Sequence, residues 1–221
     1  MAAGGTHSLA LLADQTLVAW GQNNYGQLGN GTNMDSSVPV RVEGLNKVIA
    51  IAAGLSHSLA LREDGTVWAW GHNTNGQLGD GTSASRNVAS RVSELAGVTL
   101  IAAGANHNLA LVGGPGSGGG VMAWGHNATG QLGDDSTTNR YTPVKTQDAW
   151  SGDVSRIAAG CHHSLAVTGP DSTLHAWGKN TSGQLGNGTT TDSSTPVTTL
   201  TGLTGVDKIA TAIGGDFSLA N

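Results

Sequence analysis

The sequence has 221 residues, of which 35 are glycine, only 9 are aromatic and 25 are charged, and its formal net charge is −5. So much glycine disfavours long helices, and an acidic chain without a basic run lacks the electrostatic footprint of a protein that binds nucleic acid or an anionic membrane surface. The single cysteine, Cys161, excludes a framework of internal disulfides.

We expect neither a secretion signal nor a membrane span from these residues. No apolar stretch approaches the roughly 18 residues that a membrane-spanning helix needs, so we expect no membrane partner. The first residues, Met1-Ala-Ala-Gly-Gly-Thr-His7, lack the basic and apolar regions of a secretion signal. Together with the lone cysteine, this start favours a cytoplasmic protein.

Two sequence blocks recur along the whole chain. The first block has the form Ala-Ala-Gly-x-x-His-Ser/Asn-Leu-Ala; it begins at Ala2, Ala52, Ala102 and Ala158, with a degraded copy from Ile213 to Ala220. The second block is Ala-Trp-Gly followed by Gly-Gln-Leu-Gly, and its tryptophans are 50, 54 and 53 residues apart. The repeated side chains are His7, His57, His107 and His163, then Trp20, Trp70, Trp124 and Trp177, then Gln27, Gln77, Gln131 and Gln184.

Each repeat contains strand signals, which the second repeat illustrates. The pattern predicts strands over 45–53, 57–61 and 66–70, with Asp64-Gly65 as the tight turn between the last two. Residues 71–90 are rich in Asn, Gly, Asp, Ser and Thr and are expected to form a loop. In the other repeats Pro39, Pro143 and Pro196 suit an outermost strand, where a missing N–H costs least.

These repeats predict the architecture. A unit of about fifty residues with three or four antiparallel strands cannot bury both faces of its own sheet, so it must stack on copies of itself. Radial stacking gives a β-propeller. We therefore predict one all-β domain over residues 1–221, with repeats at about 2–51, 52–101, 102–157 and 158–211 and a partial repeat at 212–221.

The pattern closely resembles the regulator-of-chromosome-condensation repeat family, and the resemblance covers essentially the whole chain. It implies a propeller and two functional precedents, both of them protein binding. The first is nucleotide exchange on a small GTPase together with chromatin binding, which depends on a β-wedge in one blade; the only insert here, residues 113–120, consists of Gly, Ser and one Pro. The second is β-lactamase inhibition through aromatic residues in the loops after Ala-Ala-Gly, where this sequence has no aromatic residue.

The repeated residues have physical roles that need no chemistry. The glycine of Ala-Ala-Gly allows a close backbone approach, and the tryptophan offers a large flat surface for packing between blades. The histidines are expected to hold the preceding loop by hydrogen bonds to backbone. The glutamine is expected to bond loop backbone, and the leucine after it to enter the core. A metal site is disfavoured, since ligands must converge on one ion and equivalent histidines lie on different radii; we expect no cofactor.

Enzymatic chemistry is also disfavoured. Cys161 lies beside His162 and His163, but neighbouring strand residues point to opposite faces. Two alternatives stay open. One, implied by the resemblance, is a regulator that acts by guanine-nucleotide exchange or β-lactamase inhibition. The other is a ligand-binding or enzymatic propeller with a site at its central channel. The strands nearest the axis carry mostly Ala, Ile and Gly, however, so we predict a non-catalytic scaffold for protein interaction.

The variable loop positions are the candidate protein-binding residues. They follow Ala-Ala-Gly or the repeated tryptophan, and they are Thr6, Tyr25, Leu55, Ser56, Asn106, Cys161, His162 and Asp216. Tyr25 is the one aromatic side chain among them, and aromatic residues are favoured at binding hot spots.

The two ends of the chain suggest self-association. The first Ala-Ala-Gly lacks the apolar run that precedes the others, such as residues 47–51, whereas residues 206–210 supply a matching run. Three assemblies stay open: a four-bladed ring closed by its own C-terminal strand, an eight-bladed ring of two strand-exchanging chains, and part of a longer propeller. Because an uncovered sheet edge is an association site, we expect a homodimer.

Overall fold

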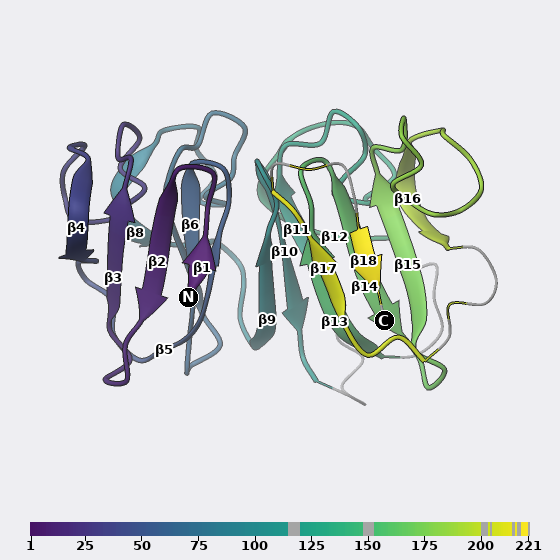
Figure 1. The fold of residues 1–221 in the computed structure, drawn as a ribbon, viewed down its shortest axis with the longest axis horizontal. Helices are drawn as coiled ribbons and strands as arrows, with labels where there is room; N and C mark the ends of the chain where they lie inside the picture. Colours follow the sequence, from purple (N-terminus) through teal and green to yellow (C-terminus); the bar gives the residue numbers. More distant parts are fainter. Residues whose placement is uncertain are drawn as a thin grey trace.

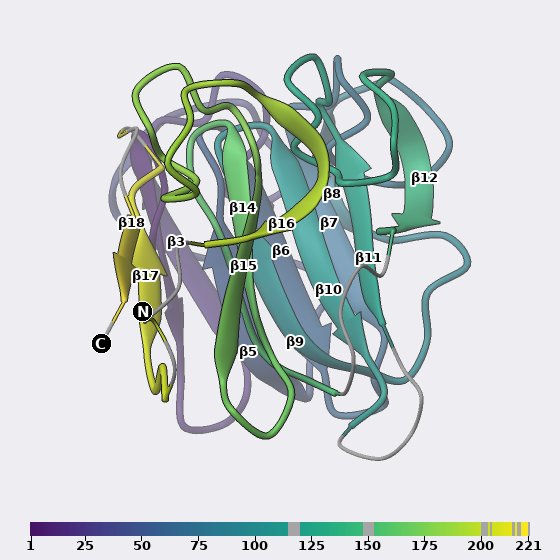
Figure 2. The same ribbon diagram turned by 90° about the vertical axis from the view of Figure 1, so that its right-hand side faces the viewer.

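The fold is all-β, as predicted. The computed structural model describes residues 1–114, 120–147, 153–199, 203, 205–213, 215 and 218–220. These residues form four antiparallel sheets of four strands each and one sheet of two strands. Figure 1 shows the sheets following one another along the chain, and Figure 2 shows them from the side. No helix in the described part is long and apolar enough to cross a bilayer.

Each four-stranded sheet is one propeller blade, and its strands are adjacent in chain order. The first blade contains β1 (Ala2–Ala3), β2 (His7–Leu11), β3 (Leu17–Gly21) and β4 (Ser36–Arg41). The second contains β5 (Val48–Ala53), β6 (His57–Arg62), β7 (Val67–Gly71) and β8 (Arg86–Arg91). The third contains β9 (Val98–Ala103), β10 (His107–Val112), β11 (Val121–Gly125) and β12 (Arg140–Lys145).

The C-terminal part continues the pattern. The fourth blade contains β13 (Val154–Ala159), β14 (His163–Thr168), β15 (Thr173–Gly178) and β16 (Ser193–Thr198), and the two-stranded sheet contains β17 (Ile209–Thr211) and β18 (Ser218–Ala220). The second, third and fourth blades therefore begin four residues before their Ala-Ala-Gly, so repeats counted from that block cut through strands such as β5. The glycine-rich insert of the third repeat falls between β10 and β11, and residues 115–119 of it lie outside the described residues.

Local chemistry explains the strand ends. Between β6 and β7, Gly65 has a φ of 73°, and the carboxylate of Asp64 accepts hydrogen bonds from the Thr66 N–H and hydroxyl at 3.1 and 2.6 Å. The fourth strand of each blade is outermost, and the three prolines predicted there lie in β4, β12 and β16. In the second repeat the predicted loop over 71–90 was too long, because β8 begins at Arg86 without a proline to mark it.

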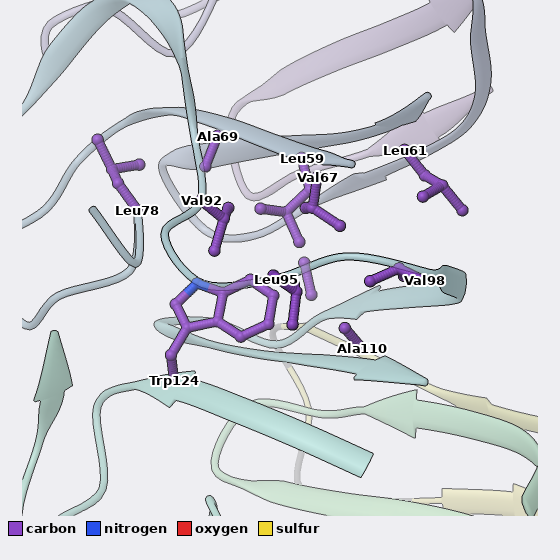
Figure 3. Close-up of a cluster of buried hydrophobic side chains, with 11 residues drawn as sticks. Leu59, Leu61, Val67, Ala69, Leu78, Val92, Leu95, Val98, Ala110 and Trp124 are labelled. Carbon is purple, nitrogen blue, oxygen red and sulfur yellow. The ribbon is translucent and has the colours of Figure 1, made fainter. Parts of the chain in front are cut away.

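The hydrophobic core is divided among the blades, and in each of the first three blades it is closed by a tryptophan from the next blade. Trp124 of the third blade is fully buried among Leu59, Val67, Leu78 and other side chains of the second blade (Figure 3). Trp70 and Trp177 are buried in the same way in the first and third blades. The tryptophan thus belongs to the core of the blade before its own.

Trp20 differs from the other three. It is only partly buried, because the described chain places no blade before the first one. On the same face of the first blade Ser8 and Ala10 are partly exposed, whereas Ser58 and Ala60 in the second blade are fully buried. The first blade therefore presents an open face with the composition of a blade junction.

The C-terminal strand does not close a four-bladed ring within the chain. β17 pairs with β18, which places Ala210 opposite Leu219 and Thr211 opposite Ser218. β1 pairs with β2, placing Ala2 opposite Leu9 and Ala3 opposite Ser8. The first of the three assemblies is therefore not adopted by the described residues.

Candidate functional site

Two sets of loops meet at one end of the blades, at the top of Figure 1. The first set follows Ala-Ala-Gly and the second follows the repeated tryptophan. Within each blade a backbone hydrogen bond ties the two sets together; these bonds run from Gln22 N to Thr6 O, His72 N to Ser56 O, His126 N to Asn106 O and Lys179 N to His162 O, at 2.9 to 3.0 Å. This end of the molecule is the candidate binding face.

The repeated histidines join blades instead of holding their own loop, which corrects the prediction from sequence. The Nε2 atom of each histidine contacts the side chain at one equivalent position of the next repeat, the position after the histidine or, in the last copy, after Phe217. The pairs are His7 and Ser58 at 2.9 Å, His57 and Asn108 at 2.7 Å, His107 and Ser164 at 2.9 Å, and His163 and Ser218 at 2.7 Å. The preceding loop is held by the histidine's backbone carbonyl, as in the 2.8 Å bond from Gly54 N to His57 O. Phe217, the counterpart in the last copy, lies outside the described residues.

The repeated glutamine and tryptophan take part in the same contact between blades. The Ser58 hydroxyl and the Trp70 indole N–H both donate to the backbone carbonyl of Gln27, each at 2.9 Å. Asn108 and Trp124 bond Gln77 O in the same way, and Ser164 and Trp177 bond Gln131 O. Each junction therefore uses a histidine and a carbonyl from one blade and a hydroxyl or amide and an indole from the next.

Close packing of the imidazole explains the glycine of Ala-Ala-Gly. A Cβ atom at Gly54 would overlap the His57 ring and lie 2.7 Å from the carbonyl oxygen of Gly104 in the next blade. Gly4 and Gly104 have the same two clashes, and Gly160 has the clash with the ring of its own histidine, His163. The glycine is needed for space between blades.

Burial keeps these imidazoles neutral. Desolvation lowers the pKa of His7 and of His57 to about 4, and it lowers the pKa of His107 well below its ordinary value of 6.5. Because Ser58 Oγ donates to Gln27 O, it accepts from His7 Nε2–H, so the proton resides on Nε2. A proton added to Nδ1 of His57 would be a buried donor with no acceptor among the described residues.

The repeated glutamine organises the loop after the tryptophan. Its Oε1 accepts the backbone N–H two residues earlier, from Tyr25, Asn75, Thr129 and Ser182 at 2.8 to 3.0 Å. The Nε2 of Gln77 also donates to His72 Nδ1 at 3.0 Å and to Asn106 Oδ1 in the next blade at 3.1 Å. The leucines that follow, Leu28, Leu78, Leu132 and Leu185, are fully buried.

A buried asparagine in each loop was missed by the sequence reasoning. It is the fourth residue of Trp-Gly-x-Asn, at Asn23, Asn73, Asn127 and Asn180. Asn73 Nδ2 donates to the carbonyls of Thr82 and Ala84 at 3.1 and 3.0 Å, and its Oδ1 accepts from Leu78 N at 2.9 Å. The recurrence of Trp-Gly-x-Asn in all four repeats is the feature of the sequence that could have identified this asparagine.

Replacing Asn73 with alanine is expected to lower the free energy of unfolding by about 2 kcal/mol, because it leaves buried backbone groups without partners. Urea denaturation of purified protein measures this loss. The matched control is Asn33→Ala, an exposed asparagine that donates to Asn24 O and accepts from Asn87 Nδ2, both at 3.1 Å. Because water can replace both of these exposed bonds, this variant should change stability by less than about 0.5 kcal/mol. Equal losses in the two variants would show that the buried network does not hold the loop.

The candidate binding residues form a row across the blades. The Tyr25 ring lies 4.4 Å from that of His72, and the His126 ring lies 6.0 Å from that of His162. Tyr25 and Leu55 are 43% and 42% exposed. Burial lowers the pKa of both His72 and His126, so both rings are neutral at pH 7.

The remaining predicted residues extend this row. Thr6 is exposed and its hydroxyl donates to Gln22 Oε1 at 2.6 Å, while Ser56, Asn106, Cys161 and His162 are half-buried. Asp216 lies outside the described residues. The structure adds His72 and His126 to the row. In the described ranges no three His, Cys, Asp or Glu side chains lie close enough together to share a metal ion.

Comparisons with known proteins agree on the family. The sequence profile of the RCC1-like domain matches residues 1–221. The chain is 35% identical over 222 residues to the human E3 ubiquitin-protein ligase HERC2, covering 100% of this chain and 4% of that protein. It is 32% identical over 198 residues to the ultraviolet-B receptor UVR8 of Arabidopsis thaliana, covering 89% of this chain and 44% of that receptor.

Solved structures show the same architecture. Human WBSCR16 superposes with a TM-score of 0.83 at 26% identity, over 99% of this chain and 56% of that one. Prp20p of Saccharomyces cerevisiae superposes with a TM-score of 0.82 at 25% identity, over 98% of this chain and 54% of that one. The chain thus spans little more than half of these propellers and a small part of HERC2. On the profile, the identities and the four blades, the chain belongs to the RCC1-like domain family.

Proposed function

We propose that the chain is a non-catalytic protein-binding scaffold whose binding surface is the row of Tyr25, Leu55, His72, His126 and His162. The observation that carries this proposal is that partly exposed aromatic, imidazole and apolar side chains lie on loops braced by buried Gln and Asn side chains. Rigid loops bearing aromatic groups bind with little loss of conformational entropy. The solved structure of Prp20p is described together with its binding to Gsp1p and histones, which supports protein binding in the family.

The test compares two variants in quantitative affinity capture. Tyr25→Ala combined with His126→Ala should reduce recovery of specific partners at least tenfold, since truncating a hot-spot side chain costs about 2 kcal/mol. Leu12→Ala combined with Glu63→Ala is the control, because these exposed residues lie at the hairpin turns on the opposite end. Equal recovery with both double variants would refute this binding face. Fluorescent-nucleotide release from a Gsp1-type GTPase, which we expect to be unaffected, separates binding from exchange.

We also propose that the chain self-associates through its first blade and its C-terminal strand. The observation in favour is the open face of the first blade, where Ser8, Ala10 and Trp20 are partly exposed. Light scattering over a concentration series should give about 44 kDa, twice the 22.2 kDa of one chain. A chain shortened to residues 1–203 should give a monomer. A monomeric intact chain at every concentration would refute self-association.

A further inference from the structure

A groove lies beside the fourth blade, at the position equivalent to the one that a tryptophan fills at each of the three interior junctions. It has a volume of about 350 Å³ and is lined by apolar side chains from the fourth blade and from β18 together with the Gln184-Leu185-Gly186 loop. Leu165, Leu174 and Leu185 form its floor and are buried, while Leu203 and Leu219 at its rim are 44% and 63% exposed.

The interior junctions show what this groove accepts. At Gly29 a Cβ atom would lie 2.7 Å from Trp70 Nε1, and at Gly133 it would lie 2.8 Å from Trp177 Nε1, because the indole covers each glycine. Both glycines are buried. Gly186, their counterpart in the fourth blade, is exposed, and its nearest such neighbour is Thr199 at 3.9 Å. The groove therefore resembles the sites that bind an indole at the interior junctions, but no indole of the described residues covers Gly186.

A buried donor also points into this region. Gln184 is 7% exposed, and its Nε2 atom has no hydrogen-bond partner among the described residues. Gln27 Nε2 likewise has no partner among the described residues although its junction is filled, whereas the counterpart Gln77 donates to Asn106 in the following blade. The residue at the position of Asn106 in the first blade is Thr6. A first blade docked at this site would therefore place the Thr6 hydroxyl near Gln184 as an acceptor.

The first blade carries the complementary half of a junction. Ser8 and Trp20 occupy the positions that Ser58 and Trp70 hold in the second blade, and both are partly exposed. The pairing of β1 with β2 has the same register as that of β17 with β18, so β17 of one copy can replace β1 beside β2 of another. β18 has only three residues and a mostly exposed Leu219, whereas Leu9 in β2 is fully buried. Replacing β18 of one copy with β2 of another therefore buries more apolar surface.

This inference rests on the proposed self-association: we infer that the groove at Gln184–Gly186, here called the socket, binds Trp20 of a second copy of this chain. The indole N–H of Trp20 bonds the Gln184 carbonyl, and the Ser8 hydroxyl replaces that of Ser218 beside His163. The second copy is favoured as occupant because the first blade of this chain exposes Ser8 and Trp20, the two groups that complete a junction. Two copies then make two equivalent junctions, one at each meeting of a first blade with a fourth.

The test uses one variant for each half of the socket. Trp20→Ala removes the indole, and Leu203→Glu places a charge at the exposed rim of the groove. Each variant alone should raise the dimer dissociation constant at least a hundredfold in light scattering. Trp68→Ala removes a partly buried tryptophan of β7 that packs at the edge of the junction between the first and second blades, away from the groove. It is the matched control and should leave the constant within threefold.

Mixing the two variants gives the sharper result. A dimer of one Trp20→Ala chain and one Leu203→Glu chain keeps one intact junction, so the mixture should recover dimers that neither variant forms alone. A dimer that persists in Trp20→Ala would overturn the socket while leaving self-association intact, and a monomeric wild type would overturn both. Binding of a peptide of residues 64–71, which contain Ala-Trp-Gly, to a monomeric wild type would show that a different strand fills the groove.

Discussion

The free energy of unfolding is expected to fall by about 3 kcal/mol for each of His7 and His57 as the pH is lowered from 6.5 to 4. Burial lowers the pKa of both imidazoles to about 4 in the folded protein, against 6.5 when the chain is unfolded. Between these values the unfolded chain binds more protons than the folded one, so the stability present above pH 6.5 is lost as the pH falls. His107 acts in the same direction.

Urea denaturation at pH 7, 6, 5 and 4.5 measures this dependence. Because domains of this kind are stable by only about 5–15 kcal/mol, the combined loss should unfold the protein near pH 4. His57→Gln is the control, since its amide can still donate to Asn108 but carries no titrating group. A pH dependence as steep in this variant as in the wild type would show that His57 is not responsible.

Replacing Trp124 with alanine is expected to cost about 4 kcal/mol of unfolding free energy. The side chain is fully buried in the core of the second blade, and its indole N–H bonds the Gln77 carbonyl at 2.9 Å. The substitution leaves a cavity and an unpaired carbonyl at one junction. Urea denaturation at pH 7 measures the loss.

The control for this prediction is Trp68→Ala. Trp68 is only partly buried and lies in β7 with the Arg62 guanidinium 5.8 Å from its ring. Removing it leaves no closed cavity, so we expect a loss of about 1 kcal/mol. Trp68 packs only at the edge of the first-blade core, so a loss as large as that of Trp124→Ala would mean that full burial and the indole hydrogen bond contribute nothing special.

The repeats made the fold predictable, but they did not reveal which neighbouring blade each repeated side chain contacts. Recurrence of Ala-Trp-Gly predicted that Trp124 packs between blades, and the structure places it there. His57 recurs just as regularly, yet its bond to Asn108 depends on how one sheet is placed against the next, which no local pattern encodes. Strand β8 was missed in part because Arg86–Arg91 has neither a proline nor a clear alternation of apolar residues.

The candidate binding row was predictable only in part. Tyr25 was identified because it is aromatic and lies in a variable loop, whereas its neighbour His72 gained importance only from the 4.4 Å separation of their rings. Asn73 was hidden for a different reason. Loops rich in Asn and Asp are typical of turns, so one asparagine with a buried role cannot be distinguished from the others by composition.

The junction of His57, Asn108, Gln77 and Trp124 has a consequence for how such a domain evolves. Every junction takes two groups from one blade and two from its neighbour, and each complete blade carries both sets. A duplicated gene segment that encodes one such unit therefore brings matching contacts for both sides. The number of blades can grow without any new interface being invented, and the loops at the end of the blades are free to diverge.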